Sequence, residues 1–390
     1  MTNRKSKSLL VNFSLSLLAL VFFSCTTEVV LRIYTSATST DICNFNKFRK
    51  EYLGASTSGF YKLSDNPDLV VELRPLAEKK ADGEDVNDFG YSAAKINADG
   101  IRADREYAVP KPPNTYRIAA VGDSTTFGWG VGNNGTYPKI LEDILKDQWR
   151  GKNVDVINFG VPGYNGKQKL VVLKEKIMKY DPDLVVMGWL IDDDNPPTYV
   201  LPPSKVVGFL LSNSNLFMCF KKKFMPINYP DAPPKERYQE NASGWKASDE
   251  FFGEIADFSR KKNIPVVMVI LPVWQPWEKN VAKGIIDVNQ LLQTMAEKKG
   301  LRAIDMFPFL KDFAIDGTSA TTFAHDSDIW HPNPMGNALI AYKIYNYLLQ
   351  NHLIPLSKNI SGIKFVPPRR SSNGTKLFGW GFEYSQIKEK

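Results

Sequence analysis

The residues with the clearest chemical potential are a serine in the first third of the chain and an aspartate and a histidine near its end. Ser124 follows the apolar run 118–121 and a Gly-Asp pair, a pattern typical of a strand that ends in a sharp turn. Asp328 and His331 lie three residues apart before a stretch with helical periodicity. A serine hydroxyl becomes a nucleophile when an imidazole takes its proton, and a carboxylate holds that imidazole in one tautomer. These residue types indicate acyl-transfer chemistry.

The aspartate and the histidine can meet through local structure, whereas the serine must be brought to them by the fold. Side chains three residues apart on a helical turn have Cβ atoms about 5–6 Å apart, so Asp328 can steady His331 locally. A Gly-Asp-Ser triplet on its own is also typical of a turn that caps a helix. The order of the elements, with Ser124 after an early strand and the Asp-x-x-His before the last helix, favours catalysis.

Three ordered blocks of the chain resemble the SGNH, or GDSL, hydrolase superfamily of serine esterases. The first block is similar to Gly122–Ser124, the second to Asn158–Tyr164 and the last to Asp328–His331. The resemblance runs from about Ile96 to Leu349. It implies a serine esterase that needs no metal and no organic cofactor.

The resemblance also implies a role for each matching residue. Ser124 is the expected nucleophile, His331 its base and Asp328 the residue that orients His331. The oxyanion is expected to bind the backbone N–H groups of Ser124 and Gly163, because Ser124 also opens a helix and Gly163 matches the glycine of the second block.

One block departs from the family pattern. The family carries Gly-x-Asn-Asp after its third strand, with the asparagine as an oxyanion donor, whereas Asp192 occupies the asparagine position here. An ionised carboxylate cannot donate a hydrogen bond, and the loss of one donor costs about a hundredfold or more in rate. Three alternatives stay open: acidic neighbours keep Asp192 protonated, Asn195 or Asn165 supplies the amide, or activity is reduced.

The acidic run that contains Asp192 has non-catalytic interpretations as well. Residues 192–194 are three consecutive aspartates, and hard oxygen ligands of this kind suit calcium. The spacing matches no calcium-loop motif, so a solvated charge cluster at the start of a loop is favoured over a cation site.

Short β-branched runs alternate with amphipathic helices through the expected catalytic domain. This pattern predicts a three-layer α/β/α sandwich around a mostly parallel, five-stranded sheet. In such a sheet the active site lies beyond the carboxyl ends of the strands, where Ser124, Gly163 and Asp192 all fall. The expected strands are 117–121, 154–159, 184–190, 264–271 and, more weakly, 303–306.

The amino terminus has the pattern of a membrane or export signal. A basic start at residues 4–7 precedes the uncharged, apolar run Leu9–Cys25, and Glu28 and Arg32 mark its far boundary. This pattern favours an uncleaved anchor with its amino end in the cytoplasm and the catalytic domain on the extracytoplasmic, or periplasmic, side. A cleaved signal peptide, or a lipoprotein modified at Cys25, is the alternative.

The remaining segments complete the expected domain organisation. Residues 1–32 form the anchor, and an irregular extension that packs on the core follows, with the turn 97–102 adding an edge strand. The insertion in the catalytic domain is expected to form a lid or a binding wall. The expected segments are 33–113 for the extension, 114–352 for the catalytic domain, 196–248 for its insertion and 353–390 for a tail on the surface.

Composition restricts the possible partners. Of the 390 residues, 43% are hydrophobic and 12% aromatic, which is typical of a globular protein. The net charge of +7 lies partly in flanking segments and not on one basic and aromatic face, so nucleic acid is not an expected partner. Trp189 and Trp330 are candidates to hold a sugar or an acyl chain, with core packing as the alternative. Cys43 and Cys219 either pair or remain buried thiols.

The sequence therefore predicts a membrane-anchored, extracytoplasmic serine esterase. Its expected substrate is an ester-bearing small molecule, glycan or lipid, and O-acetyl groups on envelope carbohydrate are inferred from the resemblance and the location. A sugar hydroxyl that replaces water as acceptor would make the protein an acyltransferase. The alternative from another class is an inactive glycan- or lipid-binding scaffold, because Asp192 stands where the family has asparagine.

Overall fold

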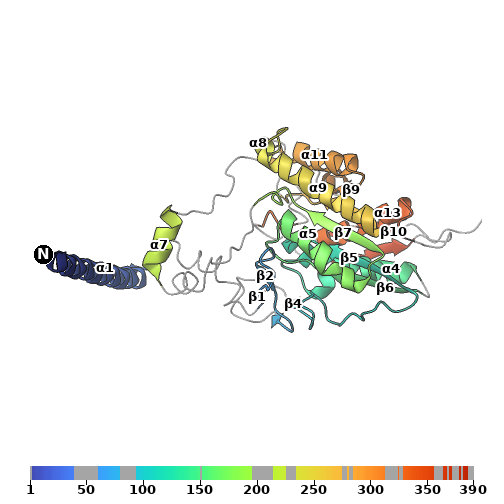
Figure 1. The fold of residues 1–390 in the computed structure, drawn as a ribbon. Coiled ribbons are helices and arrows are strands. Elements are labelled where there is room, and N and C mark those ends of the chain that lie inside the picture. The colour runs from blue at the N-terminus through green and yellow to red at the C-terminus, as the bar shows by residue number, and fades with distance from the viewer. Residues whose placement is uncertain are drawn as a thin grey trace, which may run out of the picture. The chain divides into compact units, whose positions relative to one another are not determined.

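The computed structural model describes most of the chain in two compact units (Figure 1). The first, here called the helical unit, comprises residues 1–58 and 199–229, and the second, the sheet unit, comprises 59–198 and 230–390. The described residues are 2–38, 60–79, 94–149, 152–195, 214–224, 234–274, 279–280, 284–311, 324, 328–354, 363–366, 369–370, 377–378 and 381–384.

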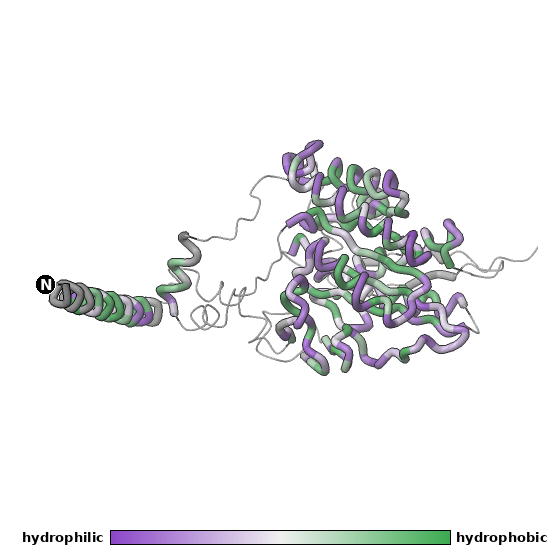
Figure 2. Tube along the Cα trace, in the orientation of Figure 1, coloured by the Kyte–Doolittle hydropathy of each residue, from purple (hydrophilic) through white to green (hydrophobic). Residues whose placement is uncertain are grey.

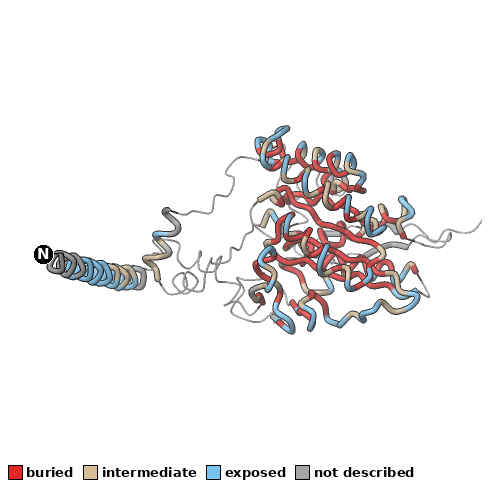
Figure 3. The backbone as a smooth tube through the Cα atoms, viewed as in Figure 1, coloured by how far each residue is buried: buried red, intermediate tan, exposed pale blue. Residues whose placement is uncertain are grey.

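The helical unit contains one long apolar helix, α1 (Thr2–Thr38). Its segment Val11–Tyr34 has a mean hydropathy of 1.9 and none of it is buried within the protein. Figure 2 shows hydrophobic residues along this helix, and Figure 3 shows that it is exposed. By length and composition α1 could be a membrane anchor or a signal sequence. The apolar segment extends past Cys25 and includes Glu28 and Arg32, which were expected to mark its far boundary; these two side chains lie one helical turn apart and pair at 2.8 Å.

Helix α7 (Asn215–Phe224) belongs to the same unit and contacts α1. The Glu28 carboxylate accepts hydrogen bonds from the backbone N–H groups of Asn215 at 3.0 Å and Leu216 at 2.8 Å, so it caps the amino end of α7. Cys219 in α7 is disulfide-bonded and Cys25 is free. Cys43, one of the two residues of the pair considered from the sequence, lies outside the described residues.

The sheet unit is built on five parallel strands in the order β6-β5-β7-β8-β9. This confirms the predicted parallel sheet. All residues of β7 and β8 are buried, as expected for strands covered on both faces (Figure 3). The strands are β5 (Thr115–Val121), β6 (Asn153–Asn158), β7 (Leu184–Trp189), β8 (Val266–Ile270) and β9 (Arg302–Asp305).

Helices flank this sheet in two groups. Helix α4 (Tyr137–Gln148) contacts α13 (Pro334–Gln350), and the apolar side chains of both join the main hydrophobic core. Helix α5 (Gly166–Glu175) contacts α9 (Ser243–Lys262), which in turn contacts α11 (Ile285–Lys298). Shorter helices connect these elements: α3 (Ser124–Phe127), η1 (Asn133–Gly135), η2 (Ile177–Tyr180), α8 (Pro234–Arg237) and α12 (Met306–Lys311).

The described part of the amino-terminal extension forms two small antiparallel pairs of strands. The prediction that the turn 97–102 adds an edge strand is wrong. The pairs are β1 (Tyr61–Leu63) with β2 (Val71–Leu73) and β3 (Glu78–Lys79) with β4 (Ala94–Lys95). The turn 97–102 folds back on itself, because Asn97 N–H donates to Ile101 O at 2.8 Å, and its bridge joins residue 96 to residue 102 and not to the large sheet.

The carboxyl-terminal segments also contain strands where a surface tail was expected. β10 (Ile363–Val366) pairs with β13 (Gly381–Tyr384), and β11 (Arg369–Arg370) pairs with β12 (Leu377–Phe378). Helix α9 begins at Ser243, inside the insertion expected at 196–248.

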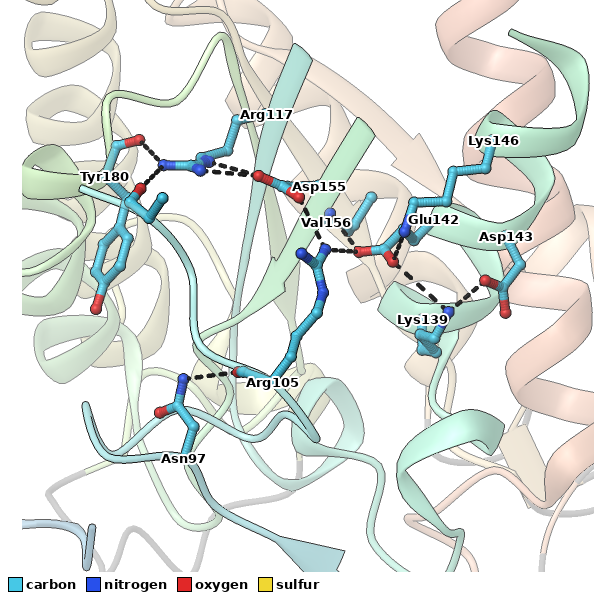
Figure 4. Close-up of polar contacts among 11 residues, drawn as sticks. Asn97, Arg105, Arg117, Lys139, Glu142, Asp143, Lys146, Asp155, Val156 and Tyr180 are labelled. Atoms are coloured by element: carbon cyan, nitrogen blue, oxygen red, sulfur yellow. Dashed lines mark hydrogen bonds and ion pairs between the residues drawn. The ribbon is translucent and has the colours of Figure 1, made fainter. Parts of the chain in front are cut away.

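A buried ion network joins the strands β5 and β6 in their amino-terminal halves (Figure 4). The Arg117 guanidinium is 1% exposed, and its Nε and Nη2 donate to Asp155 Oδ2 at 3.0 and 2.8 Å. Arg105 Nη2 donates to the other Asp155 oxygen at 2.8 Å and to Glu142 Oε2 at 3.2 Å. Glu142 in turn accepts the Val156 N–H at 3.0 Å. Every buried charge here has an opposite partner.

Candidate active site

The predicted nucleophile lies at the junction between a strand and a helix. β5 ends at Val121, and Ser124 is the first residue of α3. The Asp123 side chain caps this helix, because its Oδ1 accepts the Thr125 N–H at 2.8 Å. The first N–H groups of a helix have no intrahelical acceptor, so the Ser124 N–H is available to an anion.

The fold brings the serine, the histidine and the aspartate together. Ser124 Oγ lies 2.8 Å from His331 Nε2, although the two residues are 207 positions apart. His331 Nδ1 lies 2.6 Å from Asp328 Oδ2. With its proton on Nδ1, facing the carboxylate, the ring can accept the Ser124 hydroxyl proton at Nε2.

The aspartate is held in its ionised form and in one orientation. Burial opposes its ionisation, but the hydrogen bond and the charge of His331 hold the Asp328 pKa below its usual value. Its Oδ1 also accepts the backbone N–H groups of Trp330 at 2.8 Å and His331 at 3.2 Å. The contact is local, as predicted, but it forms in the turn that precedes α13 and not within a helix.

Two contacts from distant elements position the turn that carries His331. The Asn337 side chain in α13 donates to Pro332 O at 2.9 Å and accepts the Tyr137 N–H of α4 at 3.0 Å. The Trp274 N–H, beyond the end of β8, donates to Ile329 O at 2.7 Å. The sheet and both helices therefore set the position of the imidazole.

Gly163, the predicted second oxyanion donor, lies in a turn beyond β6. Tyr164 N–H donates to Val161 O at 3.2 Å around Pro162 and Gly163, whose φ of +82° is typical of the third residue of a type II turn. Val161 N–H donates to Gly122 O at 3.1 Å, so this turn begins beside the strand end that leads to Ser124.

The structure gives Asp192 a partner that sequence reasoning missed. Arg237 of α8 is buried, and its Nη2 donates to Asp192 Oδ1 at 2.8 Å. The same guanidinium donates to Asn195 Oδ1 at 2.6 Å and lies 3.4 Å from Asp194. A cation of the chain itself thus occupies the acidic run for which a calcium site was considered. No motif marks Arg237, because it lies 45 residues beyond Asp192 in the expected insertion.

The side-chain amide of Asn165, the other candidate for the oxyanion donor, forms hydrogen bonds within the local structure. Its Oδ1 accepts the Gln168 N–H at 3.0 Å and its Nδ2 donates to Asn195 O at 2.8 Å. Asn165 therefore caps α5 in a capping box.

The tryptophans separate into core and site residues. Trp189 is 0% exposed and packs against Phe252 with ring centroids 4.8 Å apart, so the expectation that it binds substrate is corrected to core packing. Trp330 is 37% exposed in the turn that carries His331. Trp129 was not singled out from the sequence, yet its ring stacks on that of His331 at 5.5 Å. Its proximity to Ser124 in the chain was the available signal.

A second residue that the sequence reasoning missed is Lys169 in α5. Its side chain is 0% exposed, and Nζ donates to Asp123 Oδ2 at 2.9 Å and contacts Asp193 Oδ2 at 2.5 Å. It also donates to Gly188 O at 3.0 Å. The available signal was a lysine beside the apolar positions Leu170 and Leu173 of a predicted helix.

Comparison with known proteins places residues 118–344 in one family: they match the family model described as GDSL-like lipase/acylhydrolase. An uncharacterised Bacillus subtilis protein, YpmR, is 24% identical over 242 residues, which cover 60% of this chain and 82% of YpmR.

Solved structures with similarity to this chain include two hydrolases. LAE5, an α/β hydrolase from the metagenome of Lake Arreo, has a TM-score of 0.41 and 16% identity, over 61% of this chain and 95% of LAE5. A lipase/acylhydrolase from Enterococcus faecalis has a TM-score of 0.40 and 16% identity, over 60% of this chain and 96% of that protein.

Proposed function

This chain belongs to the GDSL-like lipase/acylhydrolase family, and on that premise we propose that it is an extracytoplasmic serine esterase in which Ser124, His331 and Asp328 carry out the reaction. The observation that carries the proposal is the continuous hydrogen-bonded series from Ser124 Oγ through the imidazole to Asp328, with steps of 2.8 and 2.6 Å. The order of these contacts is the one that serine activation requires.

In the acylation half of the reaction, Ser124 Oγ forms a bond with the ester carbonyl carbon while His331 Nε2 takes the hydroxyl proton. The imidazolium is stabilised by the ionised Asp328. The tetrahedral intermediate then loses the alcohol, which leaves with the proton held by His331, and an acyl group remains on Ser124.

In the second half, an acceptor hydroxyl attacks this acyl group while His331 again takes the proton. The bond between the acyl carbon and Ser124 Oγ then breaks, and His331 returns the proton to the serine. Water as acceptor gives the carboxylic acid, and a sugar hydroxyl would give a new ester, so hydrolysis and acyl transfer differ only in the acceptor.

The oxyanion formed in both halves is proposed to bind the N–H groups of Ser124 and Gly163. Asp192 is not suited to donate, and its ion pair with Arg237 at 2.8 Å offsets the repulsion that its charge would exert on the oxyanion. Two backbone donors without a side-chain amide predict a slower enzyme than one with three.

The proposed substrate is a small acyl ester on a carbohydrate or lipid of the cell envelope, for example an O-acetyl group. This substrate class is supported by the family together with an amino-terminal helix long and apolar enough to anchor the domain at a membrane. The exposed indole of Trp330 next to His331 provides an apolar surface for a sugar face.

The test compares the full chain in detergent micelles with the Ser124→Ala variant, using p-nitrophenyl acetate. Hydrolysis should fall by about 10⁴-fold or more in the variant, because the nucleophile is lost. Ser259→Ala, a serine substitution outside the site, should retain the wild-type rate. Release of acetate from an O-acetylated polysaccharide, and acetyl transfer to an added sugar, then distinguish hydrolase from transferase.

The second candidate is a binding or scaffold protein, and the observation that favours it is the aspartate at position 192. Equal hydrolysis rates for the wild type and Ser124→Ala would contradict the esterase proposal. Binding of the polysaccharide without turnover would then support the scaffold.

A further inference from the structure

We propose that Lys169 is a positioning residue that ties the turn carrying Ser124 to the turn after β7, and so sets the spacing between the two sides of the proposed active site. The inference rests on the proposed function for its kinetic consequences. The connection of the two turns through one ammonium group does not depend on the proposed function.

The Lys169 ammonium is surrounded by oxygens of the turn that carries Ser124, of the end of β7 and of the turn that follows β7. It donates to Asp123 Oδ2 at 2.9 Å on the nucleophile side. On the other side it donates to Gly188 O at 3.0 Å and to Asp193 Oδ1 at 2.6 Å. An ammonium has three N–H donors, so these contacts use the whole group.

Each carboxylate also accepts a hydrogen bond from a backbone N–H of its own turn. Asp123 Oδ1 accepts the Thr125 N–H at 2.8 Å, which fixes the first turn of the helix that begins at Ser124. Asp193 Oδ2 accepts the Leu190 N–H at 2.7 Å, which closes the turn that also contains Asp192. These hydrogen bonds connect the backbone of the first turn to that of the second, and all the residues that form them are buried.

The charges explain why the lysine cannot be removed without consequence. Two buried carboxylates share one buried cation, so a neutral side chain at position 169 would leave Asp123 and Asp193 close together without compensation. Burial, together with the charge of Asp123, raises the pKa of Asp193 to about 7 even though Lys169 opposes the shift. The lysine therefore offsets the repulsion between the Asp123 and Asp193 carboxylates and keeps the two turns together.

Displacement of the nucleophile should affect the chemical step more than substrate binding. A misplacement of about 1 Å at a reacting atom can cost about 100-fold in rate. Neither Lys169 nor Asp193 is exposed to a substrate, so KM should change little. A residue that only supported the stability of the fold would leave kcat of the folded enzyme unchanged.

The test uses Lys169→Met and the charge-balanced variant Lys169→Met/Asp193→Asn, which leaves one carboxylate in place of two if the single variant fails to fold. Lys167→Met is the matched control, since Lys167 lies on the same helix but is exposed and pairs with Asp68. Acylation is followed as the p-nitrophenol burst, well below the unfolding temperature of each variant.

We expect the acylation rate and kcat to fall by about 10- to 100-fold in both Lys169 variants, with KM within about twofold of the wild type. Lys167→Met should behave as the wild type. A folded Lys169 variant that acylates at the wild-type rate would overturn the inference.

A second readout separates this inference from the proposed function. Hydrogen exchange should quicken at the amides of Thr125 and Leu190 in the Lys169 variants, while the amide of Val156 within β6 stays protected. Unchanged exchange at both amides would overturn the inference, whatever the activity. Quickened exchange in a protein without a Ser124-dependent burst would support the connection and reject the esterase.

Discussion

Two ion networks, toward opposite ends of the parallel sheet, compensate buried charge in different ways. Near the amino ends, Asp155 pairs with two arginines, Arg117 and Arg105, of which Arg105 also pairs with Glu142. Near the carboxyl ends, Asp193 shares one lysine with Asp123. Hydrogen bonds from the two arginines overcome burial and hold the pKa of Asp155 below its usual value, whereas burial and the second carboxylate raise that of Asp193.

This difference separates structural support from the chemistry. The network of Arg105 and Arg117 joins β5, β6 and α4 in the amino-terminal halves of the strands, whereas Ser124 follows the carboxyl end of β5, so loss of this network should weaken the fold without changing the chemical step. The network of Lys169, in which one cation faces two carboxylates, includes Asp123, the cap of the helix that begins at Ser124, and there a change in charge should reach the reaction. The predictions below test this division.

The largest effect is expected for Asp328→Asn, which keeps the shape of the side chain but removes the charge and the preferred imidazole tautomer. Turnover of p-nitrophenyl acetate should fall by about 10⁴-fold. The control is Asp155→Asn in the network of Arg105 and Arg117, which should lower stability and leave kcat of the folded enzyme unchanged. A comparable loss of kcat in Asp155→Asn would show that this network is not separate from the chemical step.

Replacement of a buried arginine should have the largest effect on stability. Arg117→Met leaves Asp155 with one cation fewer in the interior, and the free energy of unfolding should drop by about 3–5 kcal/mol. Urea denaturation followed by circular dichroism measures the change. A loss below about 1 kcal/mol, or a lower kcat in the remaining folded protein, would show that this network is not the purely structural one.

The opposite pKa shifts predict opposite responses of stability to pH. The Asp193 pKa is raised from 3.8 to about 7, so its contribution to stability is complete below about pH 4 and is lost as the pH rises through 7. The Asp155 pKa is lowered, so its contribution is present above about pH 4 and is lost as the pH falls further.

Urea denaturation of the wild type and of Asp193→Asn between pH 4.5 and 8 isolates the first of these contributions. The fall in unfolding free energy over this range should be smaller in Asp193→Asn than in the wild type, while Asp155→Asn should keep the wild-type slope. Parallel curves for the wild type and Asp193→Asn would mean that Asp193 does not titrate in this range.

The smallest effect is expected at the surface beside the site. Trp330→Ala removes a partly exposed indole, and KM for an aromatic or sugar ester should rise by a few-fold, equivalent to about 1 kcal/mol. Steady-state kinetics measure the change, and Trp129→Ala should instead lower kcat through the ring stacked on His331. An unchanged KM in Trp330→Ala would exclude contact with these substrates.

Local patterns were sufficient to predict the strands and the helices that alternate with them. Local residue types also account for the start of α13, where Asn333 accepts the Gly336 N–H at 2.9 Å and Pro334 is the first helical residue. The pairing of Asp328 with His331 belongs to the same class, because only three positions separate them. Each of these features depends on propensities and periodicities within a few residues, and these are present in the sequence itself.

Ion pairs between residues far apart in the sequence could not be predicted from local patterns. Arg237 reaches Asp192 across 45 positions, and Lys169 reaches Asp123 across 46. A lysine or an arginine carries the same charge wherever it stands, and only tertiary packing decides whether it is solvated or buried against a carboxylate. The same holds for the tryptophans. An indole packs equally well in a core or against an imidazole, so only the tertiary structure places Trp189 in the core and Trp129 against His331.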